Sequence, residues 1–423
     1  MALEQVFACR RTLTRLHSGP LGKLLEGFCG WLLERGFSRS TIRTHFAHLS
    51  HLDAYLGNPM AVARETLTAQ EVEGFLRAYP SRCRNRGPLA THLRRLRHSV
   101  HRFVAYLDQT GCFVPQPQQQ PIYQPLLDGY LEWMRRHQHA AAGTLKVRAH
   151  SITVFLQWLG PDAAPDALAG LGADRVERFF LAYAQNMGRA ARRSMQSALR
   201  TFFRFCLHQG YIHHPLDRAV PTMRTYKLAN VPRGLTEAQA QQVLGSVDRT
   251  TAIGRRDAAI LQLLYTYGVR AGQLGALRLK DIDWAQNQIL FRAAKQGKDA
   301  RLPLTPEVGQ RLLDYLQHAR PACPDPEVFV TSRAPIRPLL PRSNSLSAMV
   351  ARRIRAAGIE LPRCGAHAFR HGFATRMLQQ GHSLKAIADV LGHRHLGSTF
   401  VYTKVDLHAL RQVALEWPEE ESR

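Results

Sequence analysis

The stretch GAHAFRHGFATRM, residues 365–377, combines two chemical characters at the spacing of an α-helix. Its two phenylalanines are four positions apart, as expected for one apolar helix face. His367 precedes Arg370 and His371 by three and four positions, so these three side chains would share another face. We therefore predict a helix that packs on one side and presents an arginine with two imidazoles on the other.

The composition indicates a globular protein with a polyanionic partner. The chain has 423 residues, of which 45% are hydrophobic, so it can form two or three domains. Lys and Arg number 57 against 32 Asp and Glu, and the formal net charge is +25. Nucleic acid is the first candidate partner. No run of 18 apolar residues and no signal-peptide pattern is present, so we expect a cytoplasmic protein and no membrane partner.

The cysteines do not form a recognisable framework. They are odd in number, scattered and without a CxxC pair, at Cys9, Cys29, Cys83, Cys112, Cys206, Cys323 and Cys364. This pattern argues against both a disulfide scaffold and a zinc site.

A segment rich in proline and glutamine, VPQPQQQPIYQP (114–125), is expected to be an extended linker. Four segments that precede it recur after it in the same order, roughly 100 residues later, which predicts a duplicated helical unit. The pairs are 24–31 with 126–133, 54–57 with 157–160, 67–79 with 171–183, and 101–111 with 200–210. Chance similarity among amphipathic helices is the alternative.

Each copy also contains a stretch that is rich in arginine and free of acidic residues. Because the stretch recurs and no carboxylate balances it, we favour contact with the phosphate backbone of DNA or RNA. A solvated helix face is the alternative interpretation. The predicted DNA-binding residues are Arg94, Arg95, Arg97, Arg189, Arg192, Arg193 and Arg200.

Prolines in residues 217–236 mark a second break, and Thr236 at its end has the character of a helix N-cap. The stretch 256–268 then predicts a helix that Gly268 ends. Arg270 follows on the turn into the next helix. The third unit therefore begins with helices.

The third unit also holds a predicted hairpin and a short helix. Residues 287–304 alternate apolar side chains on both sides of a Gln-Gly turn, which predicts a β-hairpin with Lys295 near its tip. Residues 383–392 have the N-cap, the apolar face and the final glycine of a helix, so His393 lies at a helix end. Another helical run, carrying Tyr402, follows.

These residue types suit cleavage of a phosphodiester. Two guanidinium groups, from Arg270 and Arg370, can neutralise the charge that develops on the nonbridging oxygens. The phenol of Tyr402 can act as a nucleophile if an imidazole takes or orients its proton, and a lysine can protonate the departing 5′-oxygen. No DxD, HExxH or Walker pattern accompanies them, so we expect neither a metal nor another cofactor.

Three boxes of the third unit resemble those of the tyrosine recombinase, or phage integrase, family. YGVRAGQLGALRLKDIDW is similar to the first arginine box, GAHAFRHGFAT to the His-x-x-Arg-His box, and LGHRHLGSTFVYTKV to the Leu-Gly-His box with its tyrosine. Their order and spacing also agree, and the resemblance covers residues 233–410.

The resemblance implies a catalytic set and a role for each member. The set is Arg270, Lys295, His367, Arg370, His393 and Tyr402. The arginines would bind the scissile phosphate, the tyrosine would attack it, the histidines would assist with protons and hydrogen bonds, and the hairpin lysine would protonate the leaving oxygen. Lys298 is the alternative hairpin lysine.

The implied fold is mainly α, with duplicated helical core-binding modules and a mixed, mostly helical catalytic domain that has a small β-hairpin or sheet. We expect an N-terminal helical DNA-binding-like module at 1–114, a core-binding helical domain at 121–220 and the catalytic domain at 233–423. The added first module is a departure from many members of the family. Gln273 is another, because the family usually has an acidic residue at this position.

The implied function is site-specific recombination or integration, with duplex DNA cut and rejoined through a covalent 3′-phosphotyrosine, in the service of a mobile element and its transposition. The implied partners are DNA recombination sites, a homo-tetramer on two sites, and accessory proteins that bend DNA or set direction. Two alternatives remain open: a DNA-binding regulator that does not cleave, and a type IB topoisomerase-like enzyme.

Overall fold

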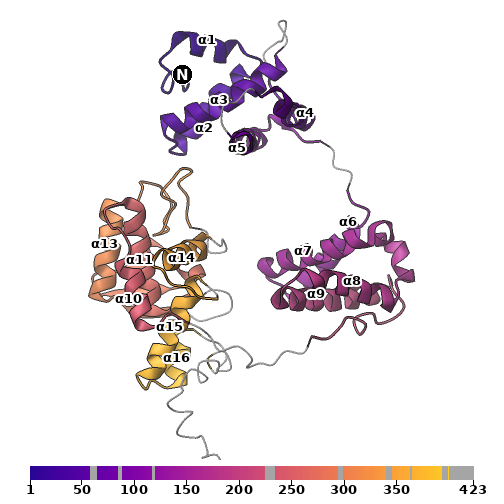
Figure 1. Cartoon of the computed structure of the whole chain (residues 1–423), viewed down its shortest axis with the longest axis vertical. Helices are drawn as coiled ribbons and strands as arrows, with labels where there is room; N and C mark the ends of the chain where they lie inside the picture. Colours follow the sequence, from indigo (N-terminus) through magenta and orange to yellow (C-terminus); the bar gives the residue numbers. More distant parts are fainter. Residues whose placement is uncertain are drawn as a thin grey trace, which may run out of the picture. The chain divides into compact units, whose positions relative to one another are not determined.

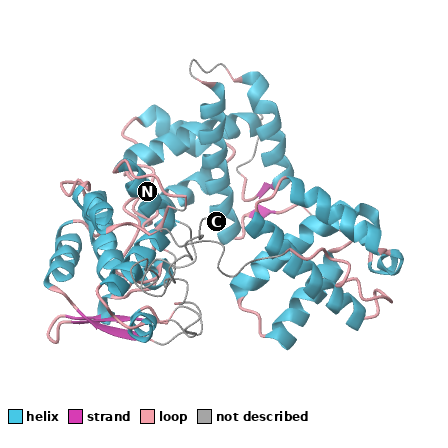
Figure 2. Cartoon of the chain, turned by 60° about the horizontal axis from the view of Figure 1, so that its bottom comes forward, coloured by secondary structure: helices cyan, strands magenta, loops and turns pink. Residues whose placement is uncertain are grey.

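The computed structural model describes residues 1–57, 64–83, 88–116, 120–223, 234–293, 299–339, 345–362, 364–392 and 399 (Figure 1). Within these residues the chain is mainly helical with two small sheets (Figure 2), which confirms the predicted fold class. It divides into two compact units, Met1–Gln116 together with Asn230–Arg423, and Pro117–Ala229.

The N-terminal module has its own aromatic core. Its elements are α1 (Arg10–Ser18), α2 (Gly22–Glu34), α3 (Arg39–Leu56), β1 (Leu67–Thr68), α4 (Ala69–Arg82), α5 (Leu89–Gln109) and β2 (Phe113–Val114). Phe28 on α2 packs against Phe46 on α3 and Phe103 on α5. The two short strands pair in parallel, and a capping box of Thr68 and Glu71 starts α4. Helices α2 to α5 therefore enclose one core.

The second module repeats this order of helices. Its elements are α6 (Gln124–Gln138), α7 (Ala142–Leu159), the 3₁₀ helices η1 (Gly160–Ala163) and η2 (Pro165–Gly170), α8 (Ala173–Gln185) and α9 (Arg189–His208). Helices α2 to α5 have 13, 18, 14 and 21 residues, and α6 to α9 have 15, 18, 13 and 20. Tyr130, Phe155 and Phe202 fill the core. Matching order and length are what the predicted duplication requires.

The predicted linker differs from the structure at its C-terminal end. Helix α6 begins at Gln124, whereas the sequence predicted an extended chain up to residue 125. Pro125 lies in the first turn of the helix, where a backbone N–H has no intrahelical partner, so a proline there does not disrupt the helix. The prediction of an extended chain is therefore wrong for Tyr123, whose backbone angles are already helical, and for the last two residues.

The third region contains the central helix α11. Its elements are α10 (Glu237–Gly245), α11 (Ala252–Tyr267), α12 (Ala271–Gly275), η3 (Leu279–Asp281), β3 (Ile282–Asp283), β4 (Gln288–Phe291), β5 (Ala300–Pro303), α13 (Pro306–His318), α14 (Ser345–Ala356), α15 (Ala366–Gln379) and α16 (Leu384–Val390). Helix α11 packs against α13, α14 and α15 (Figure 1). The predicted N-caps Thr236 and Ser383 are confirmed, because each accepts a hydrogen bond from the third residue of its helix.

The predicted hairpin is also confirmed. Strands β4 and β5 pair antiparallel with Ile289 opposite Leu302, and β3 extends the sheet beside β4. Ile289 and Phe291 point into the core, in agreement with the alternation in the sequence.

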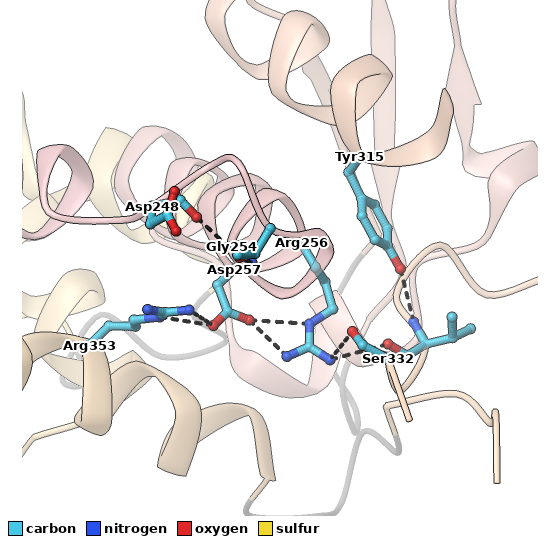
Figure 3. A network of polar contacts seen from close by, with 9 residues as sticks. Asp248, Gly254, Arg256, Asp257, Tyr315, Ser332 and Arg353 are labelled. Carbon is cyan, nitrogen blue, oxygen red and sulfur yellow. Dashed lines mark hydrogen bonds and ion pairs between the residues drawn. The ribbon is translucent and has the colours of Figure 1, made fainter. Parts of the chain in front are cut away.

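A buried ionic network fixes α11 to α14 (Figure 3). The carboxylate of Asp257 is fully buried and accepts hydrogen bonds from Arg256 at 2.8 Å and from Arg353 on α14 at 2.6 Å. Arg256 also donates to Ser332 Oγ at 3.0 Å. A buried carboxylate that lost one of these arginines would keep only the other to offset its charge, which is destabilising. The network therefore holds α14 in place, and α14 in turn packs against α15.

Candidate active site

Arg270 lies on the turn between α11 and α12, as predicted. Gly268 ends α11 in the left-handed conformation with φ of 58°, and a Cβ at this position would lie 2.6 Å from the Phe373 ring. Backbone and packing therefore both require glycine here. The turn places Nη1 of Arg270 3.4 Å from the carbonyl oxygens of Leu391 and Gly392.

Arg370 projects from α15 and is almost fully buried, with 4% of its surface exposed. Its Nη1 donates to the carbonyl oxygen of Gly268 at 2.9 Å, and its Nη2 donates to that of Leu391 at 2.8 Å. The carbonyl of Leu391 thus accepts from both Arg370 and Arg270. The structure brings together the arginines of two boxes that are far apart in the sequence, and both make further contacts besides these.

His367 stands in the first turn of α15, close to both arginines. Partial burial lowers the pKa of its imidazole, and the positive charges of Arg370 and Arg270 lower it further, although much of the residue is exposed to solvent. The ring of His371 lies 6.2 Å away. At neutral pH the imidazole of His367 is therefore uncharged and can accept a proton.

Gln273 makes specific contacts where the resemblance led us to expect an acidic residue. It is 6% exposed, and its Oε1 accepts a hydrogen bond from the backbone N–H of Arg270 at 3.1 Å. Its Nε2 donates to the carbonyl oxygen of Arg292 at 3.3 Å. The neutral amide is thus satisfied at both ends, and it joins the Arg270 turn to the end of β4.

The base of the predicted lysine hairpin is held by polar contacts. The guanidinium of Arg292 binds the carboxylate of Asp281 at 2.6 Å and 3.3 Å, and this carboxylate is 4% exposed. The backbone N–H of Ala293 donates to Asp299 Oδ1 at 2.7 Å, which links the two arms. Lys295 and its alternative Lys298 lie outside the described residues.

His393 and Tyr402 also lie outside the described residues. Helix α16 ends at Val390, Leu391 is its C-cap, and Gly392 follows with a φ of 62°. The two carbonyl groups that Arg270 contacts therefore belong to the residues directly before His393 in the sequence.

The predicted DNA-binding arginines lie on α5 and α9 and differ in exposure. Arg94, Arg95 and Arg97 are exposed on α5, and Arg189 and Arg193 are exposed on α9. Arg189 also makes a contact within the structure, and the contacts of Arg192 and Arg200 lie within the second module. Arg192 Nε donates to the carbonyl of Met187 at 2.6 Å, and Arg200 Nη2 donates to Thr222 Oγ1 at 2.6 Å and to the carbonyl of Val220 at 3.0 Å.

Other kinds of site can be assessed for the described part of the chain. There, no group of three or more histidine, cysteine or acidic side chains is arranged to hold a metal ion. All seven cysteines are free thiols. Among the described helices, none has the length and apolar character needed to cross a membrane.

Comparison with known proteins identifies the family. The sequence model of the phage integrase family matches residues 233–408. The y4rA protein of Sinorhizobium fredii, whose name calls it an integrase/recombinase, is 32% identical over 417 residues, which cover 94% of this chain and 88% of y4rA. The chain belongs to the phage integrase family. Tyrosine recombinase XerD of Xanthomonas axonopodis pv. citri is 30% identical over 304 residues, 70% of this chain and 97% of XerD.

The fold of this phage integrase family member is also that of a solved recombinase. A lambda integrase tetramer bound to a Holliday junction superimposes with a TM-score of 0.53 at 17% identity, covering 71% of this chain and 85% of lambda integrase. At this identity the likeness concerns the fold alone. Family membership makes the chain a tyrosine-type, site-specific DNA recombinase.

Several residues around the arginines were not found from the sequence. Leu391 supplies the shared carbonyl, and Asp281 with Arg292 holds the hairpin base. Every residue has a backbone carbonyl, so the sequence does not indicate which one accepts a hydrogen bond. Asp281 follows a lysine, and the pattern of the surrounding residues did not indicate that it is buried. The one useful signal was Gln273, which stood out as a departure from the family.

Proposed function

We propose that the recombinase uses Arg270, Arg370 and His367 together with Lys295, His393 and Tyr402 to cut and rejoin duplex DNA. The observation that carries this proposal is the convergence of the two arginines on the carbonyl of Leu391, two residues before His393. Two guanidinium groups at one place can bind the nonbridging oxygens of a phosphodiester in bidentate fashion and stabilise the charge of its transition state.

In the proposed cleavage step, the phenol oxygen of Tyr402 attacks the scissile phosphorus. A bond forms between this oxygen and the phosphate on the 3′ side, while the bond from phosphorus to the 5′-oxygen breaks. The phenolic proton passes to a neutral imidazole or to water, and Lys295 gives a proton to the departing 5′-oxygen. Attack by a 5′-hydroxyl of another strand reverses these bond changes, so no ATP is consumed.

The arrangement of modules extends the proposal to DNA binding and assembly. We propose that 1–114 and 121–220 are two DNA-contacting modules and that 233–423 is the catalytic domain. The exposed arginines of α5 and α9 would meet phosphates. Lambda integrase forms a tetramer on a Holliday junction, and we propose the same state on two sites for this chain. Recombination for a mobile element, accessory directionality proteins and a cytoplasmic location complete the proposal.

A nicked DNA substrate carrying the cognate site tests the chemistry, because the nick lets a short fragment diffuse away and traps the covalent intermediate. The wild type should form a denaturation-resistant protein–DNA adduct without added metal. Tyr402→Phe keeps the ring and removes the hydroxyl, so it should bind the DNA normally and form no adduct. Tyr265→Phe is the matched control, since the Tyr265 hydroxyl binds Glu237 on α10 and should not be needed for adduct formation.

Loss of a phosphate ligand should slow the same reaction without preventing binding. Arg270→Ala is the cleaner variant, because Arg270 is partly exposed whereas Arg370 is buried. We expect cleavage to slow by about 10² to 10³, the effect of removing one preorganised donor. An adduct that still forms with Tyr402→Phe, or none with the wild type on its site, would refute the proposal. Relaxation of plasmids that lack the site would favour the topoisomerase alternative.

A further inference from the structure

Gln273 connects two parts of the proposed active site through opposite ends of one buried amide. Its oxygen accepts from the backbone of Arg270, and its nitrogen donates to the backbone of Arg292, at distances of 3.1 Å and 3.3 Å. Arg270 carries one of the proposed phosphate ligands. Arg292 precedes Lys295 by three residues in the sequence. One side chain thus links the turn of the phosphate-binding arginine to the base of the lysine hairpin.

The far side of this link is anchored as well. Arg292 is held by Asp281, whose carboxylate also accepts from the backbone N–H of Arg278 at 3.0 Å. Burial acts to raise the pKa of Asp281, but the hydrogen bonds from Arg292 and the Arg278 N–H, together with the charges of both arginines, outweigh it and lower the pKa. Asp281 is therefore charged at neutral pH, and its ion pair with Arg292 persists. The carbonyl of Arg292 is consequently held in one place for the amide of Gln273 to reach.

The chemistry of this contact requires an amide. A carboxylate at position 273 could still accept from the N–H of Arg270, but it has no N–H for the carbonyl of Arg292. It would instead place a negative charge against a carbonyl oxygen in a buried site, which is unfavourable. An acidic residue, which is usual in the family at this position, is therefore incompatible with the contact to the Arg292 carbonyl.

We propose that Gln273 is a positioning residue that fixes the base of the lysine hairpin relative to the turn of Arg270. The lysine can then protonate the leaving oxygen of the phosphate that Arg270 binds. This inference rests on the proposed function, in which a hairpin lysine protonates the 5′-oxygen. A misplacement of about 1 Å can slow a reaction about a hundredfold even when no reacting group is lost. Gln273→Glu should therefore lower the cleavage rate, although it restores the acidic residue of the family.

Replacing the 5′-oxygen of the leaving group by sulfur distinguishes a defect at the lysine hairpin from a defect at Arg270. A thiolate leaves without being protonated, so a sulfur substrate does not need the lysine but still needs the arginines. Gln273→Glu should cleave the oxygen substrate about tenfold to a hundredfold more slowly than the wild type. It should cleave the sulfur substrate at close to the wild-type rate. Arg270→Ala should be slow on both substrates.

A second variant tests the same link from its far side. Arg292→Ala removes the anchor on Asp281 without altering Gln273 or Arg270, and it should show the same pattern of slow oxygen cleavage and normal sulfur cleavage. Lys295→Ala and Lys298→Ala identify the lysine whose loss the sulfur substrate rescues. Normal sulfur cleavage also demonstrates that each variant is folded and binds its DNA.

The inference is overturned if Gln273→Glu matches the wild type on the oxygen substrate, or if Gln273→Glu and Arg292→Ala are equally slow on both substrates. Failure of the proposed function gives a different result, because the wild type would then form no Tyr402-dependent adduct on either substrate. The two failures are therefore distinguishable in the same assay.

Discussion

The two helical modules have the same order of helices but hold them together with different polar groups. In the second module, Arg148 on α7 reaches α9 at an exposed edge, where Nη2 donates to Ser197 Oγ at 2.7 Å. In the first module, α3 and α5 meet through buried histidines. Nδ1 of His45 and Nδ1 of His48 each lie 2.8 Å from Ser99 Oγ. Equivalent helix pairs can thus have similar apolar cores and still be joined by different polar groups, buried imidazoles in one module and an exposed guanidinium in the other.

The histidine contact of the first module, which we call the His–Ser seam, consists of His45, His48 and Ser99. The two histidines are 6% and 8% exposed. Burial lowers the pKa of His45 to about 4, with further lowering by the charges of Arg102, His98 and His48. Burial also lowers the pKa of His48. Burial of the two imidazoles therefore favours their neutral form, and the seam loses stability when they are protonated.

The largest effect should come from removing the shared hydroxyl of the seam. Ser99→Ala leaves two buried imidazole nitrogens without a partner, so the local free energy of unfolding should fall by about 2–4 kcal/mol. Ser197→Ala is the matched change in the second module and should cost less than about 0.5 kcal/mol, because its contact is exposed. Amide hydrogen exchange in the full-length chain reports both. Equal losses in the two modules would contradict the comparison.

The second largest effect should come from acidification, which should destabilise the first module more than the second. Because the pKa of His45 is lower in the folded state than its usual 6.5, the unfolded chain binds more protons between about pH 4 and 6.5. The contribution of neutral His45 to the free energy of unfolding is fully present above pH 6.5 and is lost as the pH falls toward 4. From pH 7 to pH 5, His45 alone should lower the stability of the first module by about 2 kcal/mol.

The control for acidification is the second module within the same molecule, where protection of α7 and α9 should change little over this range. The ionisable groups around the seam are His45, His48 and His51 on α3, Tyr79 on α4, and His92, Arg95, His98 and Arg102 on α5. Parallel losses of protection in both modules would show that the seam is not responsible.

The proposed DNA contacts of the modules can be compared through salt. Replacing Arg94, Arg95 and Arg97 by Ala should flatten the plot of log affinity against log salt by about two to three units, at about 0.9 for each phosphate that is no longer neutralised. The double change of Arg189 and Arg193 should flatten it by about one to two units. An unchanged slope for the triple variant would show that these arginines do not contact phosphates and form a solvated helix face instead.

Arg200 should give the smallest effect. Its Nη2 is already engaged with Val220 and Thr222, so Arg200→Ala should change the salt slope by less than about one unit. It should instead lower the protection of the region where α9 meets Val220 and Thr222 by about 1 kcal/mol, the contribution of a typical hydrogen bond. A change in slope as large as that of an exposed arginine, measured beside Arg193→Ala, would reverse this assignment.

Local features of the fold were predictable from the sequence, and long-range contacts were not. Thr236, Ser383 and Gly268 were identified as helix ends because caps depend on residues within one turn. The seam could not be predicted, because His45 and Ser99 are 54 positions apart and a histidine on an amphipathic helix gives no sign of its partner.

The candidate site shows the same limit. Arg270 and Arg370 were selected by resemblance to a family, since neither charge nor spacing implied that they meet. Their meeting point, the carbonyl of Leu391, lies 121 positions from Arg270 and 21 from Arg370. Gln273 stood out as a departure from the usual acidic residue of the family. Its partners could not be predicted, because only the fold brings the turn of Arg270 and the base of the hairpin together.

The shared carbonyl of Leu391 has a consequence for the temperature dependence of cleavage. Each arginine side chain carries about 2 kcal/mol of rotamer entropy. Because Arg270 and Arg370 are already ordered by carbonyl groups, most of that entropy is lost when the chain folds, before any DNA arrives. When the phosphate binds, the arginines mainly exchange one hydrogen-bond acceptor for another and need little further ordering. The entropy of activation for cleavage should therefore be small.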